Sequence, residues 1–434
     1  MASMLTTEPR RVKAPREGAR HDMPEFTFGP YSLNTEASRL TRDGAEVRLR
    51  PRAFHALRVL LSHVGGVVDY DTIIAEGWDG VHVSRHTVDV TLAEVRCRLG
   101  EYGRWIEHRG KFGYALQVPL SDELVRQGWH FWSQRTRAGC ERAIDCFTRV
   151  TADCSSNFRA FEGLSASYLA LAVFGMRCPL TMYSRFLEAH TRAVALTGLR
   201  PELRCDRAFG LHLFEHRPCE AEAEFSRVLA QKPTLPSAYV RLALLYCGTG
   251  RFDEAMETIA RGTRVDPLLG TLAAAEVLMH NWRRDFETAV LVGRRSVELH
   301  PHLQTVRVNY AQALQFAGRL DEALAQYQIA SIIAPDVPWL RALEGACLAA
   351  MGRGDDAHAM LVTLEALRHS EYVDAYHMAV FRNALGRPRE ALAELERAYA
   401  ENSAWLYAVD VDPLFDALRA DSGFRRVLRR RRAS

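Results

Sequence analysis

The first quarter of the chain changes from short alternating runs to helical periods of apolar residues. Residues 26–49 contain short extended runs interrupted by Gly-Pro, Asn-Thr and Asp-Gly pairs, which is typical of a small antiparallel sheet. From Pro51 onward, apolar residues recur at helical spacing until the Gly65–Gly66 pair, so a helix is predicted to begin at the proline and end at the glycines. A second, short helix is expected at residues 71–78.

The most regular helical pattern lies in residues 84–99, where an apolar stripe runs beside a polar one. Val88, Leu92, Val95 and Leu99 form the apolar stripe. Thr87, Thr91, Glu94 and Arg98 repeat its spacing one residue earlier. Ser84 precedes the run as the expected N-cap. A helix with one buried face and another face of hydrogen-bonding groups suits the major groove of DNA, and an ordinary amphipathic surface helix is the alternative.

Residues 105–118 contain two extended runs around Arg109-Gly110-Lys111, which predicts a hairpin with a basic tip. A sheet, three helices and a hairpin, in this order, are typical of a winged helix-turn-helix. We therefore expect an α+β domain of this type over residues 25–118. Residues 1–24 are rich in Arg, Pro and small polar residues without a period, so they are predicted to form a disordered arm.

Residues 121–434 follow a different pattern, with a period of 34 residues. Small residues, prolines and glycines each recur in this period. The positions are Ala221, Ala255, Ala289, Ala323, Ala357 and Ala391, then Pro233, Pro267, Pro301 and Pro335, and finally Gly250, Gly318, Gly352 and Gly386. This is the signature of the tetratricopeptide repeat, so an all-α solenoid is predicted.

The end of the repeat region is expected to form a cap. After Tyr399 the 34-residue pattern gives way to a different apolar distribution. The residues expected to plug the open end of the array are Trp405, Pro413, Phe415, Leu418 and Phe424. We therefore predict capping helices within residues 121–434.

Three segments of the N-terminal domain together resemble a known family. They are L-R-P-R-A-F-H-A-L-R-V-L-L at residues 49–61, H-T-V-D-V-T-L-A-E-V-R-C-R-L at residues 86–99 and F-G-Y-A-L at residues 112–116. In this order they resemble the OmpR/PhoB-type DNA-binding domain, and with the repeats behind it the chain is similar to the HilA/CadC-like group of regulators. The resemblance implies that the helix from His86 enters the major groove. It also implies that the hairpin, or wing, reaches the adjacent minor groove or its phosphates.

Carried over by position, the resemblance implies two sets of DNA contacts. The residues that would face base edges or nearby phosphates are Thr87, Val90, Thr91 and Glu94. Those that would contact or approach the DNA backbone are Arg85, Arg96 and Arg98, and the cations of the wing are Arg109 and Lys111. Many family members carry arginines where this helix has Ala93 and Glu94. Glu94 can accept a hydrogen bond from the amino group of cytosine but repels phosphate, so the target sequence should differ. The usual wing arginine aligns with Gly110, so the choice between its two basic neighbours stays open.

The inner face of the array is the expected partner site. In such arrays the first helix of each pair lines a concave groove. By phase, the groove residues are Asn281, Gln312, Gln315 and Trp339. Amides beside an aromatic ring suit an extended peptide or a small ligand, while a solvent-facing or interhelical role is an equally good interpretation.

The composition and motifs of the chain make several classes of protein less probable than others. The 434-residue chain is 48% apolar and 25% charged with a net charge of +3, so no general affinity for polyanions follows. The nine cysteines are scattered without zinc-ligand spacing, which favours reduced thiols in the cytoplasm and no metal site. No apolar run reaches the roughly 18–20 residues of a membrane span, so no membrane partner is expected. The motifs of nucleotide-binding and hydrolytic enzymes are missing from the sequence, so we expect neither catalysis nor a cofactor.

Together these patterns favour a bacterial, sequence-specific transcriptional regulator that binds double-stranded DNA. The resemblance implies that it acts as an activator. Its array would sense a partner or ligand or mediate oligomerisation. Residues 26–118 carry twelve Lys or Arg and eleven Asp or Glu, so one copy should bind modestly and a homodimer on DNA is expected. The resemblance also implies contact with RNA polymerase through the loop near residues 77–83. The alternative is a tetratricopeptide adaptor whose winged helix has lost specific DNA binding, which Glu94 and the near-neutral charge support.

Overall fold

The chain divides into two compact units, each with its own hydrophobic core. The computed structural model describes residues 25–42, 44–79 and 81–433, with side chains up to residue 429. The predicted disordered arm, residues 1–24, lies outside the described residues. The first unit extends to Arg126 and the second begins at Gln127, so helix α4 (Leu120–Ser133) runs across the boundary.

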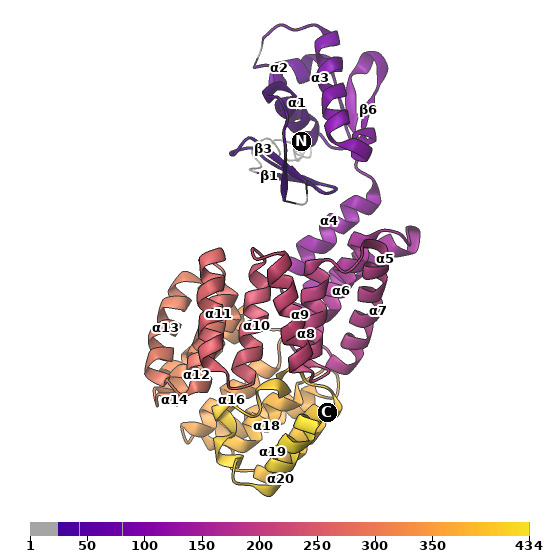
Figure 1. The fold of residues 1–434 in the computed structure, drawn as a ribbon. Coiled ribbons are helices and arrows are strands. Elements are labelled where there is room, and N and C mark those ends of the chain that lie inside the picture. The colour runs from indigo at the N-terminus through magenta and orange to yellow at the C-terminus, as the bar shows by residue number, and fades with distance from the viewer. Residues whose placement is uncertain (1–24, 43, 80, 434) are drawn as a thin grey trace, which may run out of the picture. The chain divides into compact units, whose positions relative to one another are not determined.

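The first unit contains two small antiparallel sheets and three helices (Figure 1). Strands β1 (Glu25–Phe28), β2 (Tyr31–Asn34), β3 (Arg39–Arg42) and β4 (Ala45–Val47) form a four-stranded sheet in chain order. The helices are α1 (Pro51–Ser62), α2 (Tyr70–Gly77) and α3 (Arg85–Arg98). Strands β5 (Val67–Val68), β6 (Ile106–His108) and β7 (Tyr114–Leu116) form a second sheet in the order β5-β7-β6. The predicted winged helix-turn-helix is confirmed, and β5 adds a strand that the sequence did not indicate.

The predicted stripe of α3 forms the centre of the first core. Val88, Leu92, Val95 and Leu99 are fully buried. The Ser84 hydroxyl accepts a hydrogen bond from the Thr87 amide at 3.3 Å and so caps the first turn. Asp69 caps α2 in the same way, by accepting from the Thr72 amide at 2.7 Å. These caps and the buried stripe fix which side of α3 faces outward.

The second unit is a helical array in which the 34-residue period is confirmed. Its helices are α5 (Arg137–Asp153), α6 (Phe158–Val173), α7 (Pro179–Thr197), α8 (Pro201–Leu213), α9 (Pro218–Gln231), α10 (Pro236–Gly248), α11 (Phe252–Val265), α12 (Gly270–Arg283), α13 (Phe286–Leu299), α14 (Gln304–Phe316), α15 (Leu320–Ile333), α16 (Trp339–Ala350), α17 (Gly354–Leu367), α18 (Ala375–Ala384), α19 (Pro388–Ala400) and α20 (Ser422–Ala433). The six phased alanines, Ala221 to Ala391, are fully buried in α9, α11, α13, α15, α17 and α19. Because alanine has a small side chain, it lets the paired helices approach closely.

The turn inside each repeat uses one residue in the left-handed region. At the four phased glycines, Gly250, Gly318, Gly352 and Gly386, φ is 71–76°. The same phase places His216 at φ 52° and Arg284 at φ 66°, although left-handed backbone costs any residue with a Cβ atom about 1 kcal/mol or more. The Arg284 guanidinium pairs with Asp416 at 2.6 Å and donates to the Trp282 carbonyl at 2.9 Å, which offsets the strain.

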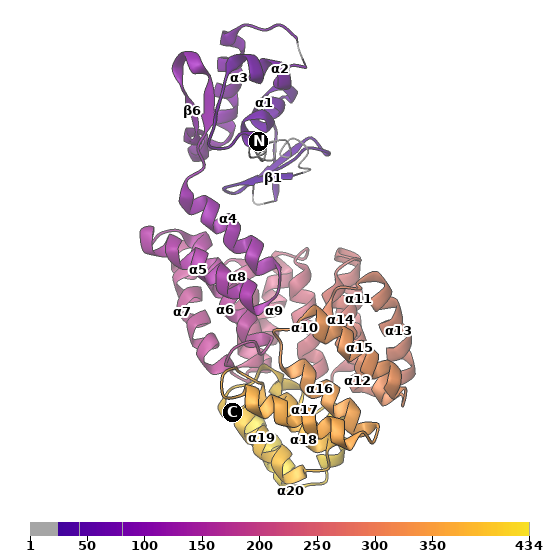
Figure 2. The ribbon, with the colours of Figure 1, turned by 180° about the vertical axis from the view of Figure 1, so that it is seen from behind.

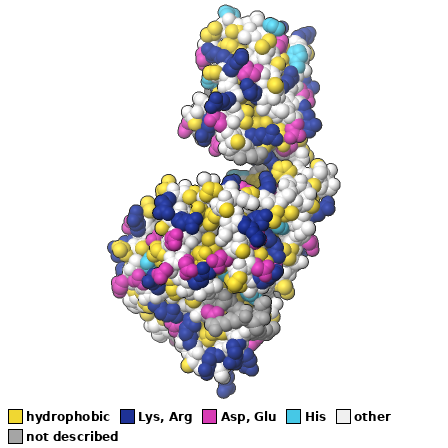
Figure 3. Space-filling model, viewed as in Figure 1, with side chains coloured by type: hydrophobic (Ala, Val, Ile, Leu, Met, Phe, Trp, Pro, Cys, Tyr) yellow, Lys and Arg dark blue, Asp and Glu magenta, His cyan; other side chains and the backbone are white. Residues whose placement is uncertain are grey.

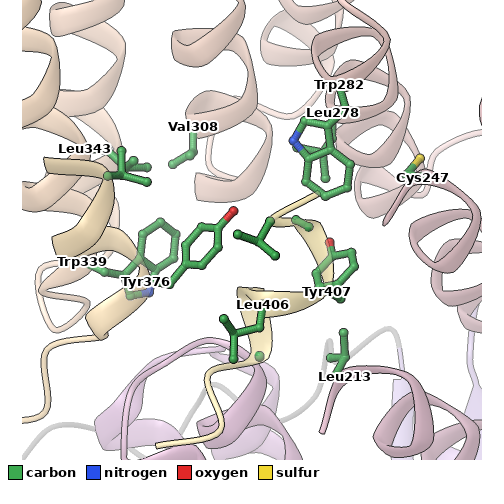
Figure 4. Packing of buried hydrophobic residues seen from close by; sticks show 14 of the residues in the cluster. Leu213, Cys247, Leu278, Trp282, Val308, Trp339, Leu343, Tyr376, Leu406 and Tyr407 are labelled. Atoms are coloured by element: carbon green, nitrogen blue, oxygen red, sulfur yellow. The ribbon is translucent and has the colours of Figure 1, made fainter. Parts of the chain in front are cut away.

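Residues 403–418, the closing segment, pack inside the array. The segment contains the 3₁₀ helices η3 (Ala404–Ala408) and η4 (Pro413–Leu418), and η3 contacts α6, α8 and α10. The Tyr407 ring lies 5.0 Å from His212 and 5.6 Å from Trp282, among side chains of several helices (Figure 4). Phe415, Leu418 and Phe424 of the expected cap are buried. Helix η4 packs against α18 and α20 packs against α19, at the end of the array, whereas η3 lies against the inner face.

Hydrogen bonds also join early and late segments of the array, whose course Figure 2 shows from behind. Trp339 on α16 donates its indole N–H to the Phe174 carbonyl at 2.7 Å. Arg137 on α5 pairs with Glu371 at 2.8 Å, 234 residues later. The curved array thus closes on itself around the closing segment.

The strain at Arg284 generates a prediction for stability. Arg284→Ala loses the Asp416 pair but keeps a Cβ atom in left-handed backbone, whereas Arg284→Gly loses the pair and relaxes the backbone. We expect Arg284→Gly to be more stable than Arg284→Ala by about 1 kcal/mol, measured from thermal unfolding of the helical circular dichroism signal. Gly318→Ala, at the same phase with open space around the new Cβ atom, is the control for the backbone cost alone. Equal midpoints for the two Arg284 variants would contradict the argument.

Candidate nucleic-acid interface

The outward side of α3 carries most of the predicted DNA contacts. Arg85, Thr87, Val90 and Arg98 are exposed, and Thr91 and Glu94 are half-buried beside them. Neither Arg85 nor Arg98 forms an ion pair with any of the residues that the structure describes, and the Arg85 guanidinium lies 5.1 Å from the Tyr70 ring centre. The helix therefore presents two uncompensated cations near its ends and small polar or apolar groups between them.

The two threonines present oxygen acceptors to solvent. The Thr91 hydroxyl donates to the Thr87 carbonyl at 2.8 Å, which leaves its oxygen lone pairs and its methyl group for a ligand. The Thr87 and Ser84 hydroxyl oxygens lie 3.0 Å apart and share a hydrogen bond. Such a face favours ligands that offer N–H donors and methyl groups, as base edges do in the major groove.

Glu94 has a cationic neighbour that the sequence analysis missed. Its Oε2 lies 3.8 Å from Nε of Arg50, the N-cap residue of α1. Glu94 is 24% exposed and Arg50 is 84% exposed, so the carboxylate is partly covered while the guanidinium faces solvent. The pair reduces the repulsion that Glu94 alone would exert on phosphates. No sequence signal joins these two residues, since the contact forms only when α1 packs against α3.

Arg96 has a bracing role in place of the expected contact with the DNA backbone. Its Nε and Nη2 donate to the Ile106 carbonyl at 2.8 and 2.6 Å. Its guanidinium also lies 5.3 Å from the Tyr114 ring centre. Arg96 therefore ties α3 to the strands of the wing.

Asp89 forms a second tie between α3 and the wing. Its Oδ1 accepts hydrogen bonds from the hydroxyls of Tyr70 at 2.8 Å and Tyr114 at 2.7 Å. The Tyr70 oxygen also lies 2.9 Å from Nε2 of His108 on β6. Burial raises the pKa of Asp89, but the Tyr114 and Tyr70 hydroxyls outweigh this effect and leave the pKa below its usual value. The ionised carboxylate thus holds α2, α3 and the wing together.

The tip of the wing carries both predicted cations in different surroundings. Arg109 pairs with Glu107 at 2.5 Å, whereas Lys111 forms no ion pair with the described residues. Gly113, which follows the tip, has φ 115°, and a Cβ atom there would lie 2.0 Å from the Val68 carbonyl oxygen. The close approach to β5 therefore requires glycine at this position. Of the two wing cations, Lys111 is the one whose charge is available to a ligand.

Two of the four predicted groove residues of the array are buried, and the two glutamines are half-buried. Asn281 is fully buried and donates to the Asn309 carbonyl at 2.8 Å, and Trp339 is 1% exposed. Gln315 accepts from the Tyr327 hydroxyl at 3.0 Å. Gln312 borders a cavity of about 10 Å³, room for about one water molecule. Asn281 and Trp339 therefore do not line an open groove, because the closing segment covers the inner face.

Metal-binding clusters and membrane-crossing helices are both absent from the part of the chain that the structure describes. Within it, no group of three or more His, Cys, Asp or Glu side chains is placed to hold a metal ion. No helix there combines the length and apolar character that crossing a membrane requires.

The hydrogen bonds to Asp89 are expected to stabilise the wing locally. Tyr114→Phe removes one of two hydroxyl donors to a carboxylate, which should cost about 1–2 kcal/mol. We expect faster amide hydrogen exchange in residues 106–116, measured by mass spectrometry on the full chain. Tyr31→Phe is the matched control, because the Tyr31 hydroxyl donates to the Leu99 carbonyl, away from the wing. Unchanged exchange in the wing of the Tyr114 variant would show that the tie does not stabilise it.

Comparisons with known protein families agree with the division of the chain into two units. The family described as transcriptional regulatory protein, C terminal, matches residues 44–116, and the tetratricopeptide repeat family matches residues 215–275. No curated protein sequence matches the chain significantly.

Solved structures resemble the chain in fold. A human IFIT1 dimer with m7Gppp-AAAA is 15% identical, with 80% of this chain and 90% of that chain covered and a TM-score of 0.51. A monomeric mutant of IFIT1 with m7Gppp-AAAA is also 15% identical, with 88% of this chain and 90% of that chain covered and a TM-score of 0.53. At this identity the likeness concerns the fold alone. Residues 44–116 thus form an OmpR/PhoB-type domain of the transcriptional regulatory protein family, joined in this chain to tetratricopeptide repeats.

Proposed function

We propose that this protein is a sequence-specific transcriptional regulator that reads double-stranded DNA through α3 and the wing. The observation that carries the proposal is the joint geometry of these elements. A capped helix presents acceptors and a methyl-lined face, and two polar ties hold it to a hairpin with an unpaired lysine at its tip. Such an arrangement fits one major groove and the adjacent backbone.

The proposed contacts divide into base readers and backbone contacts. Val90, 56% exposed, suits a thymine methyl group, and Glu94 suits the amino group of cytosine. Thr87 and Thr91 would accept from base amino groups. The phosphate contacts would come from Arg85, Arg98, Lys111 and the pair-bound Arg109. Arg50 would join them, because it faces solvent beside Glu94.

Two copies on one site would supply the affinity that a single copy lacks. The net charge of residues 26–118 is only +1, and phosphate neutralisation provides most non-specific DNA affinity. We therefore propose a homodimer, or side-by-side copies, on repeated half-sites in the bacterial cytoplasm. As part of the proposal, the protein activates transcription without catalysis, by contacting RNA polymerase through the loop near residues 77–83. Residue 80 of this loop lies outside the described residues.

The array would serve as a surface for a protein partner or for oligomerisation. Its inner face is occupied by the closing segment, so sensing of a peptide or small ligand there would require the segment to leave. On the face shown in Figure 3, basic and acidic side chains are interspersed over the second unit. Ion pairs such as Arg251–Glu222 at 2.6 Å balance charges within the second unit outside the arginine-rich helix α20. This charge balance favours a protein over nucleic acid as the partner of the array.

A tetratricopeptide adaptor without specific DNA binding is the second candidate. The near-neutral charge of the first unit favours it. The Arg50 neighbour of Glu94 and the free Lys111 favour the regulator instead.

Selection of the purified full-length protein against random duplex DNA, at two salt concentrations, tests the proposal. We expect a recovered motif made of repeated half-sites. Capture that shows no sequence preference and disappears at the higher salt concentration would overturn the regulator and favour the adaptor.

Two single variants separate base reading from backbone binding. Glu94→Ala should change the preference at one base pair by about 1–3 kcal/mol. Lys111→Ala should weaken binding to all sequences alike and reduce the slope of affinity against salt by about one. Both are measured by titration of matched and single-mismatch duplexes. A Lys111 variant that changed preference at a base pair, or a Glu94 variant that weakened all sequences equally, would contradict the assignment.

A further inference from the structure

One aromatic side chain of the first unit is exposed without an evident structural reason. Phe112, at the tip of the wing, is 64% exposed. It is the only Phe, Tyr or Trp classed as exposed among the residues that the structure describes. Single exposed hydrophobic residues are common on protein surfaces. This one lies at a proposed contact site, where a ligand can cover it.

The ring is held outward by a well-defined turn. The 3₁₀ helix η2 (Gly110–Phe112) forms the tip, and the Phe112 amide donates to the Arg109 carbonyl at 3.2 Å. The Arg109 amide donates to the Gly113 carbonyl at 2.8 Å and closes the loop. Since Gly113 packs directly against Val68, the tip is anchored to the sheet behind it. The position of Phe112 is thus fixed before any ligand arrives.

The neighbours of the ring favour DNA over a protein or a lipid surface. Lys111 Nζ lies 5.4 Å from the ring centre, and Arg109 precedes the turn. The ring therefore has one unpaired cation beside it, Lys111, while Arg109 is paired with Glu107. Val67, 54% exposed, borders the same hollow with Arg109 and Phe112, so the apolar patch is small. Many minor-groove proteins insert one apolar side chain between base pairs while nearby cations contact the phosphates. A small apolar surface with Lys111 beside it fits this mode of binding.

We propose that Phe112 is an apolar wedge that enters the minor groove beside the half-site read by α3 and partly unstacks one base step. The inference rests on the proposed function, because it needs α3 to place the wing on DNA. Lys111, which forms no ion pair with the described residues, contacts a flanking phosphate while the ring inserts. Flexible pyrimidine–purine steps open at lower energetic cost, so the wing adds sequence preference at a step that α3 does not touch.

The test uses full-length protein and a duplex that carries the selected motif. The adenine analogue 2-aminopurine is placed in turn at the steps beside the motif, because its fluorescence rises when it unstacks. We expect a rise at one step with the natural protein and with Phe112→Leu, and no rise with Phe112→Ala. Phe112→Ala should also bind about tenfold more weakly, which corresponds to about 1.4 kcal/mol, and lose its preference at that step. Leu291→Ala, at a 67% exposed position on α13, is the matched control and should behave as the natural protein.

Each other outcome has a definite meaning. If the natural protein selects no motif, the proposed function fails and the wedge fails with it. If the motif is bound and Phe112→Ala binds and unstacks as the natural protein does, the wedge alone is overturned. If Phe112→Ala leaves DNA binding intact but changes the oligomeric state in solution, the ring is a protein contact and the wedge is likewise overturned.

Discussion

The contact surface of the first unit depends on two polar ties between α3 and the wing. Arg96 reaches the Ile106 carbonyl, and Asp89 gathers the hydroxyls of Tyr70 and Tyr114. Both sets of hydrogen bonds join a residue of α3 to residues on or beside the second sheet. A recognition helix and a hairpin can address one ligand together only if their relative position is fixed beforehand, and these ties fix it. Polar residues on α3 therefore have two separate tasks, internal support and contact with a ligand.

The sequence predicted the elements well because their signals are local and periodic. The buried stripe of α3, its Ser84 cap and the 34-residue alanine period needed no knowledge of tertiary contacts. The site was predicted less well. Arg96 looks like any exposed arginine in a helical pattern, and its use depends on the Ile106 carbonyl ten residues later. Arg50 and Asp89 were missed for the same reason.

The repeat period of the array predicts its helices but not whether its inner face is open. Repeat phase correctly places Asn281 and Trp339 on first helices, but phase cannot tell whether an inner face is open. That depends on residues 403–418, which lie outside the period and return to the interior of the array. Tyr376 donates to Asp412 at 2.7 Å and Ser403 donates to Asp374 at 2.7 Å, so buried polar contacts anchor the segment together with its apolar side chains. A surface that usually receives ligands has become a core.

The closed array also changes how the second unit responds to stress. In an open repeat protein each repeat contacts only its neighbours, so the terminal repeats fray independently of the middle. Here Arg137 reaches Glu371, and Arg284 in a central turn reaches Asp416 near the end of the chain. Both ends of the array are thereby bound to its middle or to each other. The unit should behave as one cooperative body, in which damage at either end is felt throughout and partly folded intermediates are scarce.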